Sequence, residues 1–384
     1  MQSPSKLTSQ GESIFSVMTA MATKHQALNL AQGFPDFECD PALLDIARYY
    51  LSNSKLQQYA PMPGILNLRK QVANIIKNCY QAEFDPENEI TITAGGTQAL
   101  YTAFSTFIKP GDQVIVFDPA YDSYDPAIKL QGGFPVHIPL LPPQFKIDWG
   151  QVEKNINPAT KAIVINNPHN PSGAVLSTTD LDMLSALVLK YKLLVIADEV
   201  YEHMVFDSHK HQSLYSRIEL RQNSIIIGSF GKTLHTTGWK IGTLTADATL
   251  SFKLRQVHQF QVFAVNHPLQ HAIADYLQQY TPYLELPVFY QKKRDYFKTK
   301  LQNSLWKFLP CKGTYFQLLD YSAISNLPDT EMAFDLVTTY GIACIPVSVF
   351  YAGSVKPNLL RVCFAKTEQS LNQGAAILNS IQGL

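Results

Sequence analysis

Two hydrophobic patterns alternate through the middle of the chain. Short runs rich in Val and Ile are apolar at nearly every position, which is typical of strands buried on both faces of a sheet. They predict strands at 89–93, 113–118, 135–140, 161–166, 193–198, 224–230 and 241–246. The longer segments between them show helical spacing, and one of them, residues 177–192, opens with Ser and Thr capping residues. This alternation predicts an α/β fold with a mainly parallel seven-stranded sheet.

The pattern changes near both ends of the chain. After about residue 281, a long helix, a hairpin over 308–321, another helix, a strand over 359–365 and a terminal helix predict a smaller α+β domain. The first 45 residues contain Pro and Gly breaks, so we expect an arm with little structure of its own that joins the small domain. The expected division is therefore an arm over 1–45, a large domain over 46–280 and a small domain over 281–384.

Composition narrows the class of protein. The chain has 384 residues, 46% of them hydrophobic, which is ample for a large core. Lys plus Arg and Asp plus Glu both number 31, so no net charge draws the chain to nucleic acid or to an anionic membrane. A polar N-terminus and the lack of a long apolar run predict a cytoplasmic protein. Its five scattered cysteines indicate free thiols and no metal site.

In a parallel α/β sheet, ligands bind beyond the carboxyl ends of the strands, so the residues directly after each strand are the candidates for a ligand site. Gly95, Gly96 and Thr97 follow the first strand and begin a helix. The N-terminal amides of a helix favour a phosphate, but the same small residues also occur in an ordinary tight turn. Tyr121 or Tyr124, after the second strand, could stack on a planar ligand, or either ring could belong to the core.

The next two strand ends carry polar side chains. Asn166 and Asn170 lie in a Pro-rich segment, where an amide can donate to a phenolate oxygen or simply form a turn. Asp198 ends an apolar strand, with Tyr201 three residues later. Since a buried carboxylate is costly unless it is paired, Asp198 either caps a helix or holds a protonated ring nitrogen.

Ser229, Lys232 and Lys240 follow the sixth strand. The string Gly231-Lys232-Thr233 invites a nucleotide-binding loop, but Ile226 stands where that loop requires glycine. A lone lysine here is usually a solvated surface residue. Taken together, however, the strand ends supply what a pyridinium cofactor with a phosphate needs: an anion cradle, a stacking ring, an acid for the ring nitrogen, a donor for the ring oxygen and a lysine for the aldehyde.

Seven motifs in order carry a resemblance to a known family. The chain resembles the fold type I enzymes that depend on pyridoxal 5'-phosphate (PLP), specifically the class I and II aminotransferases. Within them it is similar to the kynurenine aminotransferase and glutamine transaminase K branch, and more so to the bacterial methionine aminotransferase type. The motifs are QGFPDF (32–37), QYAPMPGILNLR (58–69), TAGGTQAL (93–100), NNPHNPSG (166–173), DEVYEH (198–203), SFGKTLHTTGWKIG (229–242) and LLRVCFAK (359–366).

The resemblance implies a role for each residue that matches the family. Lys232 bears the cofactor and later moves the proton, Asp198 pairs with the ring nitrogen, and Tyr201 and Asn170 bind the ring oxygen. Tyr121 stacks on the ring. The phosphate is held by Gly95, Gly96, Thr97, Ser229, Lys240 and, from the neighbouring subunit of a homodimer, Tyr59. Lys240 departs from many family members, which carry Arg there; a lysine still binds phosphate as a point charge.

The substrate side is implied in the same way. Arg361 binds the substrate carboxylate, assisted by Asn170 and the backbone of Gly33, although without the resemblance it could equally be a surface arginine on a late strand. The residues Phe15, Phe34, Tyr59, Tyr121 and Phe263, or others near them, could line an apolar pocket, although such aromatic residues more often belong to the core. The implied reaction moves an amino group from an apolar or aromatic L-amino acid to a 2-oxo acid, with methionine favoured and aromatic amino acids, kynurenine or glutamine also accepted. The alternatives are a PLP-dependent C–S β-lyase and, remotely, a non-catalytic PLP sensor.

Overall fold

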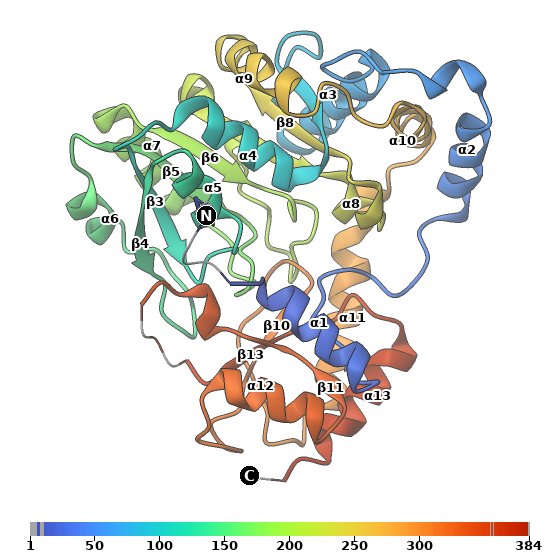
Figure 1. The fold of residues 1–384 in the computed structure, drawn as a ribbon, viewed down its shortest axis with the longest axis vertical. Helices are drawn as coiled ribbons and strands as arrows, with labels where there is room; N and C mark the ends of the chain where they lie inside the picture. Colours follow the sequence, from blue (N-terminus) through green and yellow to red (C-terminus); the bar gives the residue numbers. More distant parts are fainter. Residues whose placement is uncertain (1–5, 8–10, 354, 356, 383–384) are drawn as a thin grey trace, which may run out of the picture.

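The computed structural model describes residues 6–7, 11–353, 355 and 357–382. Its largest sheet has seven strands in the order β2-β8-β7-β6-β5-β3-β4, and β8 alone runs antiparallel to its neighbours. Figure 1 shows this sheet in one half of the molecule and a smaller group of strands and helices in the other. The predicted α/β fold with a mainly parallel seven-stranded sheet is confirmed.

The strands of this sheet begin and end within two residues of their predicted limits. Neighbouring residues along each strand point to opposite faces: in β3, Val114 and Val116 pack into one core cluster, whereas Ile115 and Phe117 pack into the other. Because helices cover both faces, all four side chains are buried. The strands are β2 (Ile90–Thr93), β3 (Gln113–Asp118), β4 (Phe134–Pro139), β5 (Thr160–Asn166), β6 (Leu194–Asp198), β7 (Ser224–Ser229) and β8 (Gly242–Ala246).

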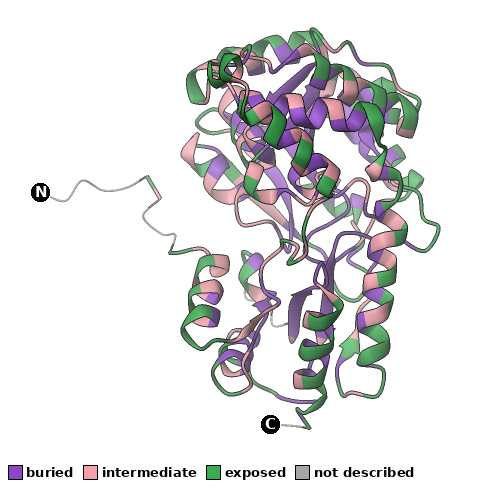
Figure 2. Cartoon of the chain, turned by 90° about the vertical axis from the view of Figure 1, so that its right-hand side faces the viewer, coloured by how far each residue is buried: buried purple, intermediate pink, exposed green. Residues whose placement is uncertain are grey.

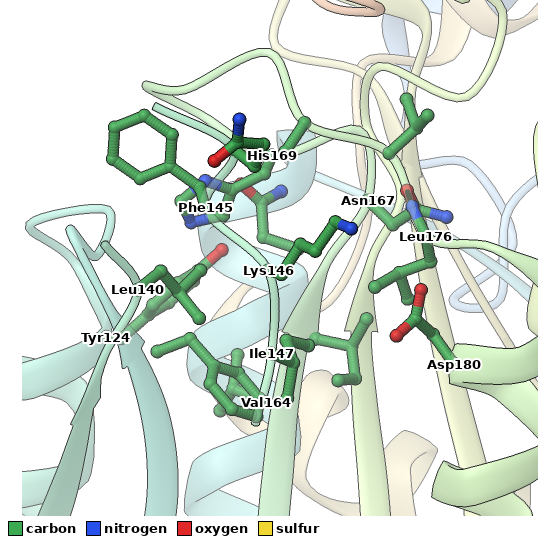
Figure 3. Close-up of a pocket in the computed structure, with 16 residues that line it drawn as sticks. Tyr124, Leu140, Phe145, Lys146, Ile147, Val164, Asn167, His169, Leu176 and Asp180 are labelled. Carbon is green, nitrogen blue, oxygen red and sulfur yellow. Dashed lines mark hydrogen bonds between the residues drawn. The ribbon is translucent and has the colours of Figure 1, made fainter. Parts of the chain in front are cut away.

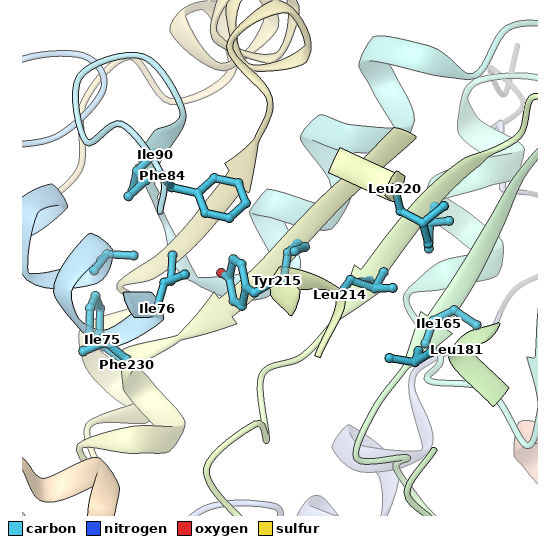
Figure 4. Close-up of a cluster of buried hydrophobic side chains, with 14 of the residues drawn as sticks. Ile75, Ile76, Phe84, Ile90, Ile165, Leu181, Leu214, Tyr215, Leu220 and Phe230 are labelled. Carbon is cyan, nitrogen blue, oxygen red and sulfur yellow. The ribbon is translucent and has the colours of Figure 1, made fainter. Parts of the chain in front are cut away.

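Helices close the two faces of this sheet. Helices α4, α5 and α9 supply the apolar partners on one face, and the other face packs against a larger cluster that includes Leu181, Tyr215 and Phe230, shown in Figure 4. Ser177 and Asp180 form a capping box at the start of α7. The helices are α2 (Pro41–Leu51), α3 (Leu66–Tyr80), α4 (Gly95–Phe107), α5 (Tyr124–Leu130), α6 (Trp149–Asn155), α7 (Thr178–Tyr191), α8 (Phe230–Thr233), α9 (Ala248–Gln261) and α10 (His267–Gln279).

The C-terminal part forms its own antiparallel sheet, in the order β12-β13-β10-β9. The predicted hairpin appears as the pairing of β9 with β10, and the predicted late strand is β13. Helices and strands here are α11 (Leu286–Lys300), β9 (Lys307–Phe308), β10 (Phe316–Asp320), α12 (Asp329–Thr338), β11 (Ile342–Ala343), β12 (Ile345–Pro346), β13 (Leu359–Cys363) and α13 (Glu368–Asn379). Short 3₁₀ turns connect the elements: η1 (Ser54–Gln57), η2 (Leu214–Ser216), η3 (Ile218–Asn223), η4 (Thr237–Trp239), η5 (Pro282–Leu284) and η6 (Ser348–Phe350).

The expectation that the first 45 residues have little structure of their own is wrong. They contain α1 (Ile14–Lys24) and β1 (Leu28–Asn29), and β1 pairs in parallel with β11. The helix forms because apolar residues recur every three or four positions, and two of them, Met18 and Ala22, are buried in the C-terminal core. Most of the polar N-terminal segment over 1–13 lies outside the described residues.

Figure 2 shows the elements in two groups, one above the other; the division of the chain at about residues 45 and 280 stays a proposal. One core cluster joins α1 and β1 to the elements after α11, whereas two others lie on the faces of the seven-stranded sheet. Within the described part of the chain, no helix is long and apolar enough to cross a membrane.

Candidate active site

A cavity of about 190 Å³ lies at the carboxyl ends of β2, β5, β6 and β7. Its wall contains residues from each of the strand ends that the sequence singled out. Those that the sequence analysis named are Gly95, Gly96, Thr97, Tyr121, Asn166, Asn170, Asp198, Tyr201, Ser229, Lys232 and Lys240; the others are Leu100, Val200, Gly231 and Thr237. The parallel sheet therefore gathers at one edge residues that are up to 145 positions apart in the chain.

The glycines at the start of α4 leave the backbone open toward the cavity. Gly95 has a φ of +78°, a left-handed conformation that favours glycine. A Cβ at Gly96 would come within 2.9 Å of the Val200 side chain, and one at Gly95 would lie 3.3 Å from the Lys240 amine. Backbone N–H groups and a lysine amine thus converge at a helix N-terminus, an arrangement suited to a phosphate.

Asp198 ends β6 and is buried beside Tyr124. The Tyr124 hydroxyl donates a hydrogen bond of 2.6 Å to the Asp198 carboxylate. Burial raises the pKa of Asp198 to about 6, against the opposing effect of the Tyr124 hydrogen bond. A buried carboxylate aimed into a cavity is suited to pair with a cationic ring nitrogen.

Tyr121 and Tyr124 take different positions. Tyr121 lines the cavity, whereas Tyr124 lies behind it and contacts Asp198. The sequence suggests a stacking or a core position for Tyr124 and gives no hint of its contact with Asp198. The available signal is its place after β3, which β5 separates from β6, because the carboxyl ends of these parallel strands lie at one edge of the sheet.

A second cavity, shown in Figure 3, lies on the other side of Tyr124. Its volume is about 60 Å³, and its wall includes Tyr124, Phe145, Asn167 and His169. Burial lowers the pKa of His169 to about 4, so the imidazole is neutral near pH 7. This space suits a few water molecules and is too small for a cofactor.

Lys232 lies in α8, directly after β7, with its amine pointing toward the C-terminal part of the chain. The amine donates to the Tyr315 hydroxyl at 2.6 Å and to the Gly33 carbonyl at 3.1 Å. Burial lowers the pKa of Lys232 to about 8, and Arg361 and Lys240 act in the same direction. Such a lysine is a competent base near neutral pH.

Arg361 lies on β13 and is only 1% exposed. Its guanidinium donates to the Asn170 side-chain oxygen at 2.9 Å and to the Ala31 carbonyl at 2.8 Å, and its Nε is buried without a partner. The carbon at the centre of the guanidinium lies 3.9 Å from the centre of the Phe316 ring and 4.9 Å from that of Phe15. A planar cation with an unpaired N–H is suited to a carboxylate.

The remaining predicted residues, like Arg361, are not among those that line this cavity. Gly33 contacts Lys232 through its carbonyl, and Phe15 stands beside Arg361 and Phe350. The Phe34 ring is 44% exposed, under the Lys366 amine, and does not line the cavity. Tyr59 is 80% exposed, beside Phe263, and also stands outside the cavity.

Comparisons with known proteins identify the class to which this fold and site belong. Residues 25–378 match the family model of class I and II aminotransferases. The chain therefore belongs to the aminotransferase class I and II family, and it is a PLP-dependent transaminase.

Individual relatives cover nearly the whole chain. It is 43% identical to a methionine aminotransferase of Escherichia coli, over 98% of both chains. It is 31% identical to human kynurenine–oxoglutarate transaminase 1, over 91% of both. A solved Escherichia coli structure described as a methionine aminotransferase superposes with a TM-score of 0.96 and 42% identity, over 99% of this chain and 100% of that one.

The donor set of the cavity fits PLP. Lys232 offers an amine and Asp198 a carboxylate, and the start of α4 offers a cradle in which a side chain at Gly95 would crowd the Lys240 amine. These are the kinds of group that the aldehyde, the ring nitrogen and the phosphate of the cofactor require.

Proposed function

We propose that the chain transfers the amino group of an apolar L-amino acid, with methionine preferred, to a 2-oxo acid. The observation that carries this proposal is the aromatic surrounding of Arg361, formed by Phe15, Phe316 and Phe350. A substrate whose carboxylate pairs with Arg361 places its side chain near these rings. Thioether sulfur and aromatic rings attract one another, which favours methionine over polar donors. The similarity to a methionine aminotransferase supports the same choice.

In this proposal each residue of the site has one task. The bound cofactor withdraws electrons from the substrate Cα. The Lys232 amine would hold the cofactor between turnovers and, once free, would take up and give back the proton of the substrate Cα. Asp198 keeps the proton on the ring nitrogen, while Tyr201 and Asn170 bind the ring oxygen. Arg361 orients the Cα–H bond through the substrate carboxylate.

We also propose that the enzyme works as a cytoplasmic homodimer with a shared active site. The exposed Tyr59 supports the dimer, because its hydroxyl reaches no cavity residue of its own chain and a large aromatic group at 80% exposure suits an interface. Tyr59 of one subunit would then complete the phosphate site of the other.

Spectral titration with single amino acids tests the substrate preference. Methionine should convert the cofactor to its aminated form at the lowest concentration, followed by aromatic amino acids, and aspartate should need far more. Product analysis with methionine and a 2-oxo acid should give equal amounts of the two new acids. Release of a thiol without a dependence on 2-oxo acid would instead indicate the β-lyase reaction.

A further inference from the structure

Tyr315 contacts the reacting lysine, although no sequence motif drew attention to it. It precedes β10 in the C-terminal part of the chain and is completely buried. Its hydroxyl accepts the 2.6 Å hydrogen bond from the Lys232 amine and donates one to the Gly33 carbonyl. A phenol has a single hydrogen, so donation to Gly33 leaves the Tyr315 oxygen as an acceptor toward the lysine; the same oxygen is also within hydrogen-bond contact of the Tyr201 hydroxyl.

The ring of Tyr315 is fixed in place by its neighbours. The ring centres of Tyr201, Phe316 and Tyr290 lie 5.2, 4.9 and 5.7 Å from it. Gly33 is equally constrained, since a Cβ there would come within 2.7 Å of the Phe316 ring. The two groups that bind the lysine amine are therefore held by packing, independently of the lysine.

The backbone before Tyr315 adds a second, independent observation. Thr314 has a φ of +68°, which is rare for a β-branched residue. Its amide donates to the Met204 carbonyl at 2.9 Å, and its hydroxyl accepts from the Phe316 amide at 3.1 Å. Strained backbone of this kind persists where the surrounding structure enforces it and gathers at functional sites. Here the residue that follows it, Tyr315, contacts Lys232.

We propose that Tyr315, together with the Gly33 carbonyl, holds the Lys232 amine in position for proton transfer during the part of the cycle in which that amine is not bonded to the cofactor. This inference rests on the proposed function, in which Lys232 carries the proton. Tyr315 is a positioning residue: it acts on the reaction through the lysine. By accepting a hydrogen bond from the amine, it also stabilises the ammonium form and so sets how readily Lys232 gives up its proton.

The test compares Tyr315→Phe with Tyr290→Phe in the full-length holoenzyme. Tyr290 is a matched control, because it is as buried as Tyr315 and packs against it, but its hydroxyl has no hydrogen-bond partner among the described residues. Tyr315→Phe should lower kcat about ten- to hundredfold with KM nearly unchanged, and should raise the isotope effect of Cα-deuterated substrate. Tyr290→Phe should behave like the wild type.

A second readout does not depend on turnover. In enzyme converted to the aminated form of its cofactor, the pH dependence of Lys232 labelling by an amine-reactive probe reports the lysine pKa. The other groups that face this amine are Asp198, Tyr201, Arg361, Cys363 and Lys240. Loss of one acceptor disfavours the ammonium form, so Tyr315→Phe should move the labelling midpoint about one pH unit lower. If Tyr315→Phe does not fold, 4-fluorophenylalanine at position 315 keeps the ring and replaces the hydroxyl with a very weak acceptor that does not ionise, and it should lower the labelling midpoint as well.

Three outcomes would overturn the proposal: equal behaviour of the two variants, a rise in KM with kcat unchanged, or an unshifted labelling midpoint. Failure of the proposed function itself has a different signature, since the wild-type enzyme would then not transaminate or Lys232→Ala would retain activity.

Discussion

The two walls of the active site are built in different ways. One wall is the carboxyl edge of the seven-stranded sheet, where Asp198 and Lys232 follow adjacent parallel strands, β6 and β7. The other wall comes from the segment around Gly33, the residues before β10 and the middle of β13, which meet through tertiary hydrogen bonds. In the proposed function, the first wall would hold the cofactor and the second would face the substrate. The comparison suggests that sheet topology fixes cofactor chemistry, whereas irregular segments set where the lysine and the substrate lie.

The cofactor wall should be the more sensitive to mutation. Asp198→Asn keeps the shape of the side chain but removes the charge that pairs with the ring nitrogen. We expect kcat/KM to fall roughly 10²- to 10³-fold, about 3–4 kcal/mol, because a buried charge pair is broken. Steady-state kinetics with methionine would measure this, with thermal melting to confirm that the variant is folded. A loss below fivefold would contradict the assignment.

The cofactor wall is also the part that the sequence predicts well. Each of its residues follows an apolar run whose limits are clear from Val and Ile content, and parallel strands place such residues at one edge. Tyr315 is different. It lies in an ordinary hairpin segment, and its contact with Lys232 depends on the φ of Thr314 and on the packing at Gly33, neither of which leaves a pattern in the sequence. The α1 helix was missed for a related reason, since the nearby Pro and Gly breaks were given more weight than its apolar spacing.

The substrate wall is tested by Arg361→Ala. Since the planar guanidinium pairs with the substrate carboxylate, its loss should raise KM for methionine about 100-fold, with a smaller change in kcat. Arg361→Lys keeps the charge without the fork and should recover only part of the affinity. If the dissociation constant of the cofactor rose as much as KM for methionine, the comparison would fail, because Arg361 would then contribute to cofactor binding as well as to substrate binding.

Tyr124→Phe should have a smaller, pH-dependent effect. Removing the 2.6 Å hydrogen bond to Asp198 leaves the carboxylate less stabilised, so its pKa, already raised to about 6 by burial, should rise further. Because cofactor binding depends on the ionised form of Asp198, the affinity for the cofactor should fall as pH decreases. In Tyr124→Phe this decrease in affinity should begin at a higher pH. We expect about a fivefold loss near pH 6 and little near pH 8. Tyr215→Phe, which removes a buried hydroxyl away from the cavity, serves as the control.

The smallest effect, on stability alone, is expected where β3 and β4 of the seven-stranded sheet meet the C-terminal part of the chain. His137 contacts Asp118 at 2.7 Å and Asp125 at 3.1 Å, and Asp118 also accepts a hydrogen bond from the Ala352 amide. Although burial opposes protonation, the two carboxylates outweigh it and raise the pKa of His137 to about 9.

Because the pKa of His137 is raised on folding, the ion pairs contribute their full stabilisation below its pKa in the unfolded chain, about 6.5. This stabilisation is lost as pH rises through the folded-state pKa of about 9. His137→Gln should therefore lower the free energy of unfolding by about 1–2 kcal/mol at about pH 6, and by much less at about pH 10. Urea unfolding at the two pH values measures the difference. An equal decrease in the free energy of unfolding at both pH values would show that the charge of His137 does not stabilise this contact.

The assignment of Lys232 as the residue that bears the cofactor underlies every step above, and one measurement tests it directly. Borohydride reduction of the PLP-loaded enzyme should fix the cofactor permanently to its lysine, and peptide mass spectrometry then locates the added mass. The result we predict is full labelling of the peptide that contains Lys232, and none in Lys232→Ala. Cofactor mass on Lys240, the other lysine of the cavity wall, or on no lysine would contradict the account.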